Sequence, residues 1–144
     1  MNETSPSVFN NPCIEDCCAL LKRVKTIAVV GLSPNASRPS YGVSASMQGF
    51  GFRVIPVHPT ATEILGEKVF ARLSDITQPV DLVNVFRQAE FIDDVVDECL
   101  KLNLKNIWIQ EGIVNPAAAQ RAIAGGMTVV MDRCIYRDYR DHCR

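Results

Sequence analysis

Apolar and polar positions along the chain alternate between two patterns. Short, β-branched apolar runs such as Ile27-Ala28-Val29-Val30 are typical of parallel strands covered on both faces. Between these runs, as in residues 91–102, apolar residues recur every three or four positions, which is the spacing of one buried helix face. The pattern predicts strands over residues 27–30, 52–57, 80–86, 107–109 and 127–131, and helices over residues 14–24, 41–49, 91–102 and 116–124.

Five strands joined by helical crossovers predict an α/β fold, a Rossmann-like doubly wound parallel sheet. With the strands numbered along the chain, we expect the order 3-2-1-4-5. In such sheets a ligand binds at the carboxyl ends of the strands, where the strand order reverses, here between the first strand and the fourth. Candidate ligand-binding residues are therefore those that directly follow a strand, in residues 31–42, 58–59, 86–88, 110–114 and 132–134.

Length and charge limit the classes of function. A chain of 144 residues suits one domain, which we place at residues 12–140, between a flexible arm of residues 1–11 and a tail of residues 141–144. Fifteen basic and sixteen acidic residues give no positive field for a nucleic acid. No apolar run approaches the roughly 20 residues of a membrane span, and the first residues do not resemble a secretory signal. We therefore expect a cytoplasmic protein that binds neither nucleic acid nor membrane.

The six cysteines do not indicate a disulfide framework, because a domain of this size without an export signal needs no cross-links. We expect mostly reduced thiols. Cys13, Cys17 and Cys18 lie at helical spacing, but the two histidines, His58 and His142, are far from them in sequence. We therefore predict no metal site.

The loop after the first strand is rich in hydrogen-bond donors. Residues 31–42 lead from that strand into a helix, where free backbone N–H groups and the helix dipole attract phosphate. Ser33, Ser37 and Ser40 add hydroxyls, and Arg38 adds a planar cationic group suited to phosphate oxygens. The sequence favours a phosphate-binding loop. The alternative is a solvated loop in which Ser40 caps the helix.

Two common nucleotide fingerprints are missing from this loop. It contains neither G-x-G-x-x-G nor the Gly-Lys-Ser/Thr of a nucleoside triphosphatase. After the second strand, His58-Pro59 stands where an NAD-binding protein carries an acidic residue for the ribose hydroxyls. A histidine tolerates a phosphorylated ribose, so NADP and coenzyme A (CoA) are better candidates than NAD. Alternatively, His58 is a partly exposed turn residue.

Five segments in this order resemble the CoA-binding domain proteins of the YccU type, a family related to the CoA-binding domain of succinyl-CoA synthetase α subunits. The segments are VVGLSPNASRPSYG (29–42), VIPVHP (54–59), ILGEKV (64–69), WIQEGIVN (108–115) and VMDRC (130–134). The resemblance covers residues 24–139 and implies that CoA, or an acyl-CoA, lies across the strand ends with its phosphates on the first loop. It assigns this nucleotide site to Gly31, Ser33, Ser37, Arg38, Ser40, Tyr41 and Gly42, to which we add His58 and Pro59. His58 departs from the Asn that many members carry before this proline.

The sequence offers no catalytic residues. In succinyl-CoA synthetase a phosphorylated histidine and a partner subunit carry the chemistry, but His58 belongs to the nucleotide side and His142 lies in residues 137–144, which we expect to be solvated. We therefore predict non-catalytic binding of CoA, with a protein partner left open. One alternative is an NADP-dependent oxidoreductase. Another is a redox-regulated protein in which Cys134, activated by Arg133, forms a mixed disulfide with CoA, although Cys134 also fits a small buried core position.

Overall fold

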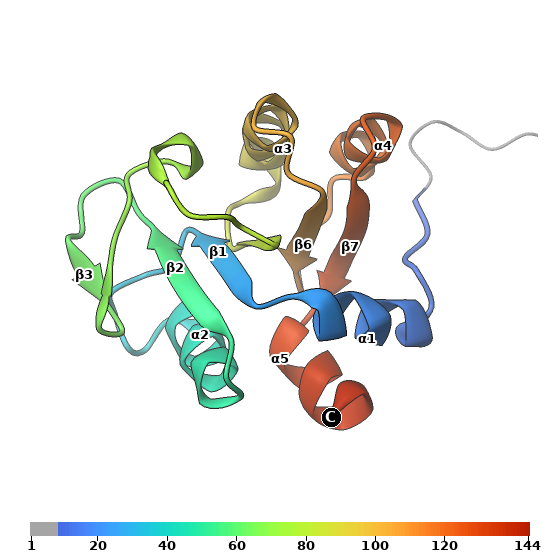
Figure 1. Ribbon diagram of the computed structural model, residues 1–144. Helices are drawn as coiled ribbons and strands as arrows, with labels where there is room; N and C mark the ends of the chain where they lie inside the picture. Colours follow the sequence, from blue (N-terminus) through green and yellow to red (C-terminus); the bar gives the residue numbers. More distant parts are fainter. Residues whose placement is uncertain (1–8) are drawn as a thin grey trace, which may run out of the picture.

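A five-stranded parallel sheet forms the centre of the computed structural model, which describes residues 9–144 (Figure 1). Every predicted strand is present within a few residues of its expected bounds, and the predicted Rossmann-like α/β fold is confirmed. The strands lie in the order β2 (Arg53–Val57), β1 (Thr26–Val30), β5 (Leu82–Val85), β6 (Asn106–Gln110) and β7 (Thr128–Arg133).

The predicted strand order is wrong. Numbered along the chain, the five parallel strands lie in the order 2-1-3-4-5, so β2 is at the edge and β5 lies beside β1. Pro56 in β2 gives the physical reason, because a proline has no N–H for a ladder and is tolerated mainly in edge strands. In contrast, all four residues of β5 are buried, as a central strand requires. The order therefore reverses between β1 and β5, which moves the expected ligand position to the ends of these two strands.

Helices cover both faces of the sheet (Figure 1). On one face lie α1 (Ile14–Arg23), α2 (Pro39–Gly49), α5 (Ile135–Asp138) and the final turn η3 (Tyr139–Cys143), and on the other lie α3 (Ile92–Lys101) and α4 (Pro116–Ala124). The chain from β2 to β5 adds the short strands β3 (Glu63–Ile64) and β4 (Glu67–Lys68) and a 3-10 turn, η1 (Leu73–Asp75); a second such turn, η2 (Ala89–Phe91), precedes α3.

Two local contacts stabilise the carboxyl end of the sheet. Asn115 caps α4, since its side-chain oxygen accepts from the Ala118 backbone N–H at 3.1 Å. Trp108 is a fully buried core residue, and its indole N–H donates to the Arg133 carbonyl at 2.9 Å. The Trp108 contact joins β6 to β7, and the Asn115 contact fixes the start of α4.

Part of the predicted N-terminal arm lies against the sheet. The Asn11 side chain donates to the Met131 carbonyl and accepts from the Met131 N–H, both at 2.8 Å, like an additional strand residue beside β7. Residues 1–8, the rest of this arm, lie outside the described residues.

The C-terminal segment is not the solvated tail that the sequence predicts. Its charged residues alternate with Tyr139 and Cys143, which pack inward. The Tyr139 ring lies 4.9 Å from the ring centroid of Phe50 and 5.1 Å from that of Phe52. The high density of charge in residues 137–144 hid this apolar spacing, and the segment forms helical turns against α1 and α2.

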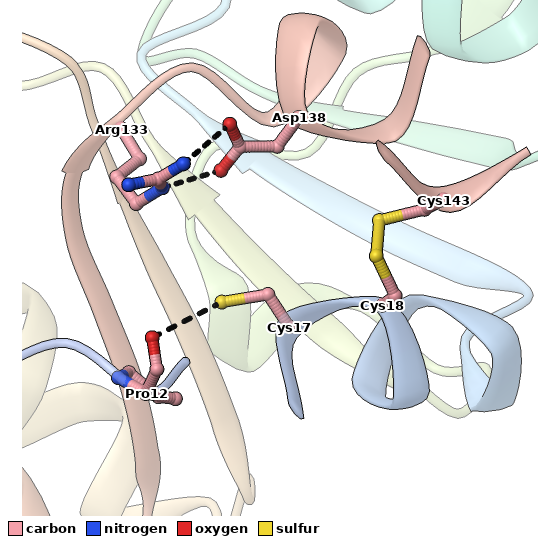
Figure 2. The surroundings of a disulfide bond; sticks show 6 residues. All are labelled: Pro12, Cys17, Cys18, Arg133, Asp138 and Cys143. Carbon is pink, nitrogen blue, oxygen red and sulfur yellow. Dashed lines mark hydrogen bonds and ion pairs between the residues drawn. A yellow bond between two sulfur atoms is a disulfide. The ribbon is translucent and has the colours of Figure 1, made fainter. Parts of the chain in front are cut away.

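A disulfide between Cys18 and Cys143 ties α1 to η3 (Figure 2). The two residues are 125 positions apart, so only the tertiary fold brings them together. The expectation of mostly reduced thiols holds for the other four cysteines but misses this pair. Burial raises the pKa of Cys99 to about 12, and burial, followed by the nearby Asp138 carboxylate, raises the pKa of Cys17. Both groups therefore remain protonated, unreactive thiols near neutral pH.

Candidate functional site

Gly31 begins the loop after β1 and passes close to the end of β5. Its φ of +86° lies in the left-handed region, and a Cβ at this position would come within 2.6 Å of the Phe86 carbonyl oxygen. Its N–H donates to the Val57 carbonyl at 3.1 Å. The loop is thus attached to the ends of three neighbouring strands, and only glycine fits at its first position.

Hydroxyl and amide groups within the loop fix its shape. The Ser40 hydroxyl oxygen accepts from the Ser33 N–H, and the Ser33 hydroxyl oxygen accepts from the Asn35 N–H, both at 3.0 Å. Each of these hydroxyls keeps its own proton for another partner. In contrast, the Ser37 hydroxyl donates to the Asn35 side-chain oxygen at 2.8 Å. Ser33 and Ser40 can therefore donate to a ligand, whereas Ser37 acts within the loop.

The start of α2 is electrostatically uncompensated. Arg38 is the N-cap residue but makes no side-chain cap, Pro39 occupies the first position, and the first turn holds no acidic residue. No residue of this first turn therefore supplies an anionic partner for the positive end of the helix dipole. Arg38 is exposed, and no carboxylate in residues 9–144 forms an ion pair with it. This corner of the molecule is suited to an anion.

A cavity of about 590 Å³ lies next to this corner. It opens between the ends of β1, β5 and β6 and reaches α5. Apolar side chains form part of its wall, and its polar lining comes from the loop after β1, the residues that follow β5, the end of β6 and α5. The cavity is lined by Gly31, Ser33, Arg38, Pro39, Ser40, Val43, Phe86, Arg87, Gln88, Ala89, Gln110, Glu111, Gly112, Ile113, Cys134 and Arg137.

Six of the nine predicted site residues surround connected hollows. Gly31, Ser33, Arg38 and Ser40 line the main cavity, and His58 and Pro59 line an adjoining hollow of about 350 Å³ that shares Gly31, Ser33 and Arg38. The remaining three, Ser37, Tyr41 and Gly42, line neither; Tyr41 packs against the core instead. The fold thus brings most of the predicted residues together, and their binding of a ligand stays a prediction.

His58 has a structural role in its turn. Its Nδ1 accepts from the backbone N–H groups of Thr60 and Ala61, at 3.2 and 3.0 Å. Nδ1 is therefore the unprotonated ring nitrogen, and the proton of the neutral ring is on Nε2. The turn interpretation of His58 is consistent with these contacts, and Nε2–H stays free to contact a ligand in the hollow.

Arg87 and Gln110 belong to the segments that the sequence marks as following a strand, but neither was assigned to the nucleotide site. Arg87 is half-buried and lines the main cavity, the hollow beside His58 and a third hollow of about 250 Å³. Its guanidinium lies 4.4 Å from the ring centroid of Phe91. Both residues directly follow or end a parallel strand, which is the only sequence signal that marks them.

The carboxylates near the cavity already have partners. Glu111 forms an ion pair with Arg137, and the Asp132 carboxylate accepts from the Gly112 N–H at 2.8 Å. Arg133, which the sequence places beside Cys134, donates two hydrogen bonds to Asp138, at 2.6 and 2.9 Å (Figure 2). The Asp138 carboxylate therefore binds Arg133, the residue that the redox alternative requires to activate Cys134.

Within residues 9–144 there is no group of three or more His, Cys, Asp or Glu side chains placed to hold a metal ion. None of the helices in this part of the chain has the length and apolar character needed to cross a membrane.

Comparison with known proteins identifies the family. Residues 25–140 match the family model described as a CoA binding domain. The chain belongs to this family. It is 44% identical over 127 residues to an uncharacterised protein, YneT of Bacillus subtilis, an alignment that covers 88% of this chain and 94% of YneT. A solved structure from Thermus thermophilus, cell-free ID.343, superposes with a TM-score of 0.85 at 34% identity and covers 90% of this chain and 98% of that one.

A larger enzyme contains a related region. An ADP-forming acetate–CoA ligase of Archaeoglobus fulgidus is 29% identical over 87 residues, which is 59% of this chain and 13% of the ligase. The chain therefore corresponds to a small part of that ligase.

Proposed function

We propose that this protein binds CoA, or an acyl-CoA, without chemical conversion, at the carboxyl ends of β1, β5 and β6. The observation that carries the proposal is the start of α2, where the first turn holds no acidic residue and Arg38, which lines the cavity, has no carboxylate partner in residues 9–144. CoA carries a pyrophosphate and a ribose phosphate, which are the charges that this corner lacks. Membership of the CoA binding domain family supports the same ligand.

The shapes of the hollows suggest how the ligand lies. The phosphates would occupy the loop of residues 31–42, with the Ser33 and Ser40 hydroxyls and Arg38 as donors. The hollow lined by His58 and Arg87 would take the phosphorylated nucleoside. The pantetheine arm would extend into the main cavity, whose walls include Val43, Phe86 and Ile113.

A binding role without catalysis is supported by the pairing of the ionisable groups. Glu111 is engaged by Arg137 and Asp132 by the Gly112 N–H, so neither carboxylate is poised as a free general base beside the cavity. The predicted cytoplasmic location suits a CoA-binding protein and is part of this proposal.

A titration followed by NMR tests the proposal. Adding CoA to the ¹⁵N-labelled protein should shift the amide signals of residues 31–42, 86–89 and 110–113, which surround the main cavity. The signals of Ala19 and Thr128, beside a hollow at the opposite end of β7, should stay in place. Shifts confined to the hollow beside Ala19 and Thr128, or no shifts at millimolar CoA, would contradict the proposal.

Cys134 supports a second candidate function, reversible covalent attachment of CoA. It is a free, buried thiol that lines the same cavity as the phosphate loop. If Cys134 attacks one sulfur of CoA disulfide as its thiolate, it forms a mixed disulfide, and the other half of the reagent leaves as CoA thiolate. No further oxidant is needed for this exchange.

Mass spectrometry tests this second function. A Cys13→Ser variant, which lacks the exposed free thiol, should gain the mass of one CoA moiety when treated with CoA disulfide at pH 8, at a peptide that contains Cys134. Cys17 and Cys99 should stay unmodified because their raised pKa values keep them protonated. Attachment that persists in a Cys13→Ser, Cys134→Ser double variant would dismiss Cys134 as the site.

A further inference from the structure

Gln110 is a buried polar residue at the floor of the main cavity. It ends β6 and is one of the residues that line the cavity, and only 5% of the residue is exposed. Buried carboxamides usually satisfy both their oxygen and their nitrogen within the protein. Within residues 9–144, the contacts of Gln110 satisfy only its side-chain oxygen.

Neighbouring groups fix the orientation of this carboxamide. The Trp108 carbonyl can only accept a hydrogen bond, and Asn84 lies 3.0 Å from it, so the Asn84 side chain must present its NH₂ group there. The same NH₂ group lies 3.3 Å from the Gln110 side chain and therefore requires an oxygen at that position. The backbone N–H of Ile135, 3.4 Å from the same oxygen, also needs an acceptor. Two donors thus place the Gln110 Oε1 toward Asn84 and α5.

The Gln110 Nε2 is consequently turned away from Asn84 and α5. It makes no hydrogen bond to any group in residues 9–144. It is not sealed in the core either, because the one enclosed side-chain polar atom without a partner in this part of the chain is the Ser44 hydroxyl. A fixed donor therefore faces the cavity at the end of β6, in a buried position where an unpaired donor is costly.

We propose that the Gln110 Nε2 donates a hydrogen bond to a carbonyl oxygen of the bound ligand, in the arm beyond the phosphates. This inference rests on the proposed function. β6 lies two strands from β1 in the sheet, about 10 Å away at ordinary strand spacing, so Gln110 is out of reach of phosphates held at the start of α2. The pantetheine arm carries two amide carbonyls, and an acyl-CoA adds a thioester carbonyl. Each of these groups accepts the hydrogen bond that Nε2 offers.

The test compares Gln110→Glu with Gln88→Glu at pH 8. The carboxylate introduced by Gln110→Glu still accepts from Asn84 and Ile135, but it replaces the cavity-facing donor with an acceptor. Gln88 lines the same cavity from an exposed position, so Gln88→Glu adds the same charge and controls for repulsion of the anionic ligand. Calorimetry should show that Gln110→Glu binds acetyl-CoA, which carries the amide and the thioester carbonyls, about tenfold or more weakly than Gln88→Glu does.

Three ligands separate the possible carbonyls: CoA, acetyl-CoA and S-ethyl-CoA, a thioether without the acyl oxygen. Contact with the thioester makes wild-type protein favour acetyl-CoA over S-ethyl-CoA, and Gln110→Glu removes this preference. If Nε2 instead contacts a pantetheine amide, Gln110→Glu weakens the binding of all three ligands equally. Gln110→Glu binding all three as tightly as Gln88→Glu would overturn the inference, whereas wild-type protein that binds none of them would overturn the proposed function.

Thermal melting shows whether Gln110→Glu folds. If it does not fold, a second pair of variants replaces it. Gln110→Met keeps the size of the side chain and removes the donor without adding charge, and Gln88→Met is its control. The same tenfold difference in acetyl-CoA affinity is expected between these two variants. Equal affinities would again overturn the inference.

Discussion

Gly31→Ala should lower the free energy of unfolding by about 3 kcal/mol and strongly weaken CoA binding. The new Cβ would lie 2.6 Å from the Phe86 carbonyl oxygen, a backbone atom that cannot rotate away, at a residue whose φ is +86°. To relieve this contact the loop must move off the end of β5, and the loop carries the proposed phosphate donors. Urea denaturation and CoA titration of the variant measure the two effects.

Gly42→Ala is the matched control. The chemical change is identical, but Gly42 lies within α2, and nothing surrounds the position of its Cβ within 4 Å. In a helix interior, alanine is more favourable than glycine by about 1 kcal/mol, so this variant should be slightly more stable and should bind CoA normally. If both variants were equally stable and bound CoA equally well, the close approach of Gly31 to β5 would have no role in the site.

Arg38→Ala should weaken CoA binding by about 1.5 to 3 kcal/mol, which is tenfold or more in affinity. The guanidinium is exposed, has no carboxylate partner in residues 9–144 and lies at the cavity entrance, so a phosphate is its natural partner. The fold should remain intact because an exposed loop side chain contributes little to stability. Calorimetry at low salt measures the loss.

Arg53→Ala removes the same charge from the amino end of β2, away from the cavity, and should leave the affinity unchanged. Dephospho-CoA, which lacks the ribose phosphate, shows which phosphate Arg38 contacts. An unchanged effect of Arg38→Ala with this ligand indicates contact with the pyrophosphate, and a lost effect indicates contact with the ribose phosphate. Equal affinity of Arg38→Ala and Arg53→Ala for CoA would mean that the phosphate loop is wrongly assigned.

The sequence predicted the elements of the fold well because their periodicity is local. The sequence likewise predicted that a loop leads from the first strand into a helix, whereas the binding of phosphate by this loop stays a prediction. The strand order was predicted wrongly although Pro56 carried the signal, since a proline within a strand favours the edge of a sheet. With β2 placed at the edge, β5 becomes the neighbour of β1 and brings Arg87 to the site.

Other features depend on contacts that no local pattern records. Cys18 and Cys143 meet only because α1 and η3 pack on the same face of the sheet. The orientation of the Gln110 carboxamide follows from Asn84 and Ile135, which belong to two other elements. The Ser37 hydroxyl also depends on such a contact, because it suits phosphate by type but donates to Asn35 inside the loop, and its role at the site stays a prediction.

Calorimetric titration of the wild-type protein with CoA and, separately, with NADPH tests the central claim most directly. Both ligands carry a pyrophosphate and a phosphorylated ribose, but only CoA has a pantetheine arm for the cavity between β5 and β6. We predict saturable binding of CoA at one site per chain and much weaker binding of NADPH. Saturable heat from NADPH with none from CoA would contradict the account and favour the oxidoreductase alternative.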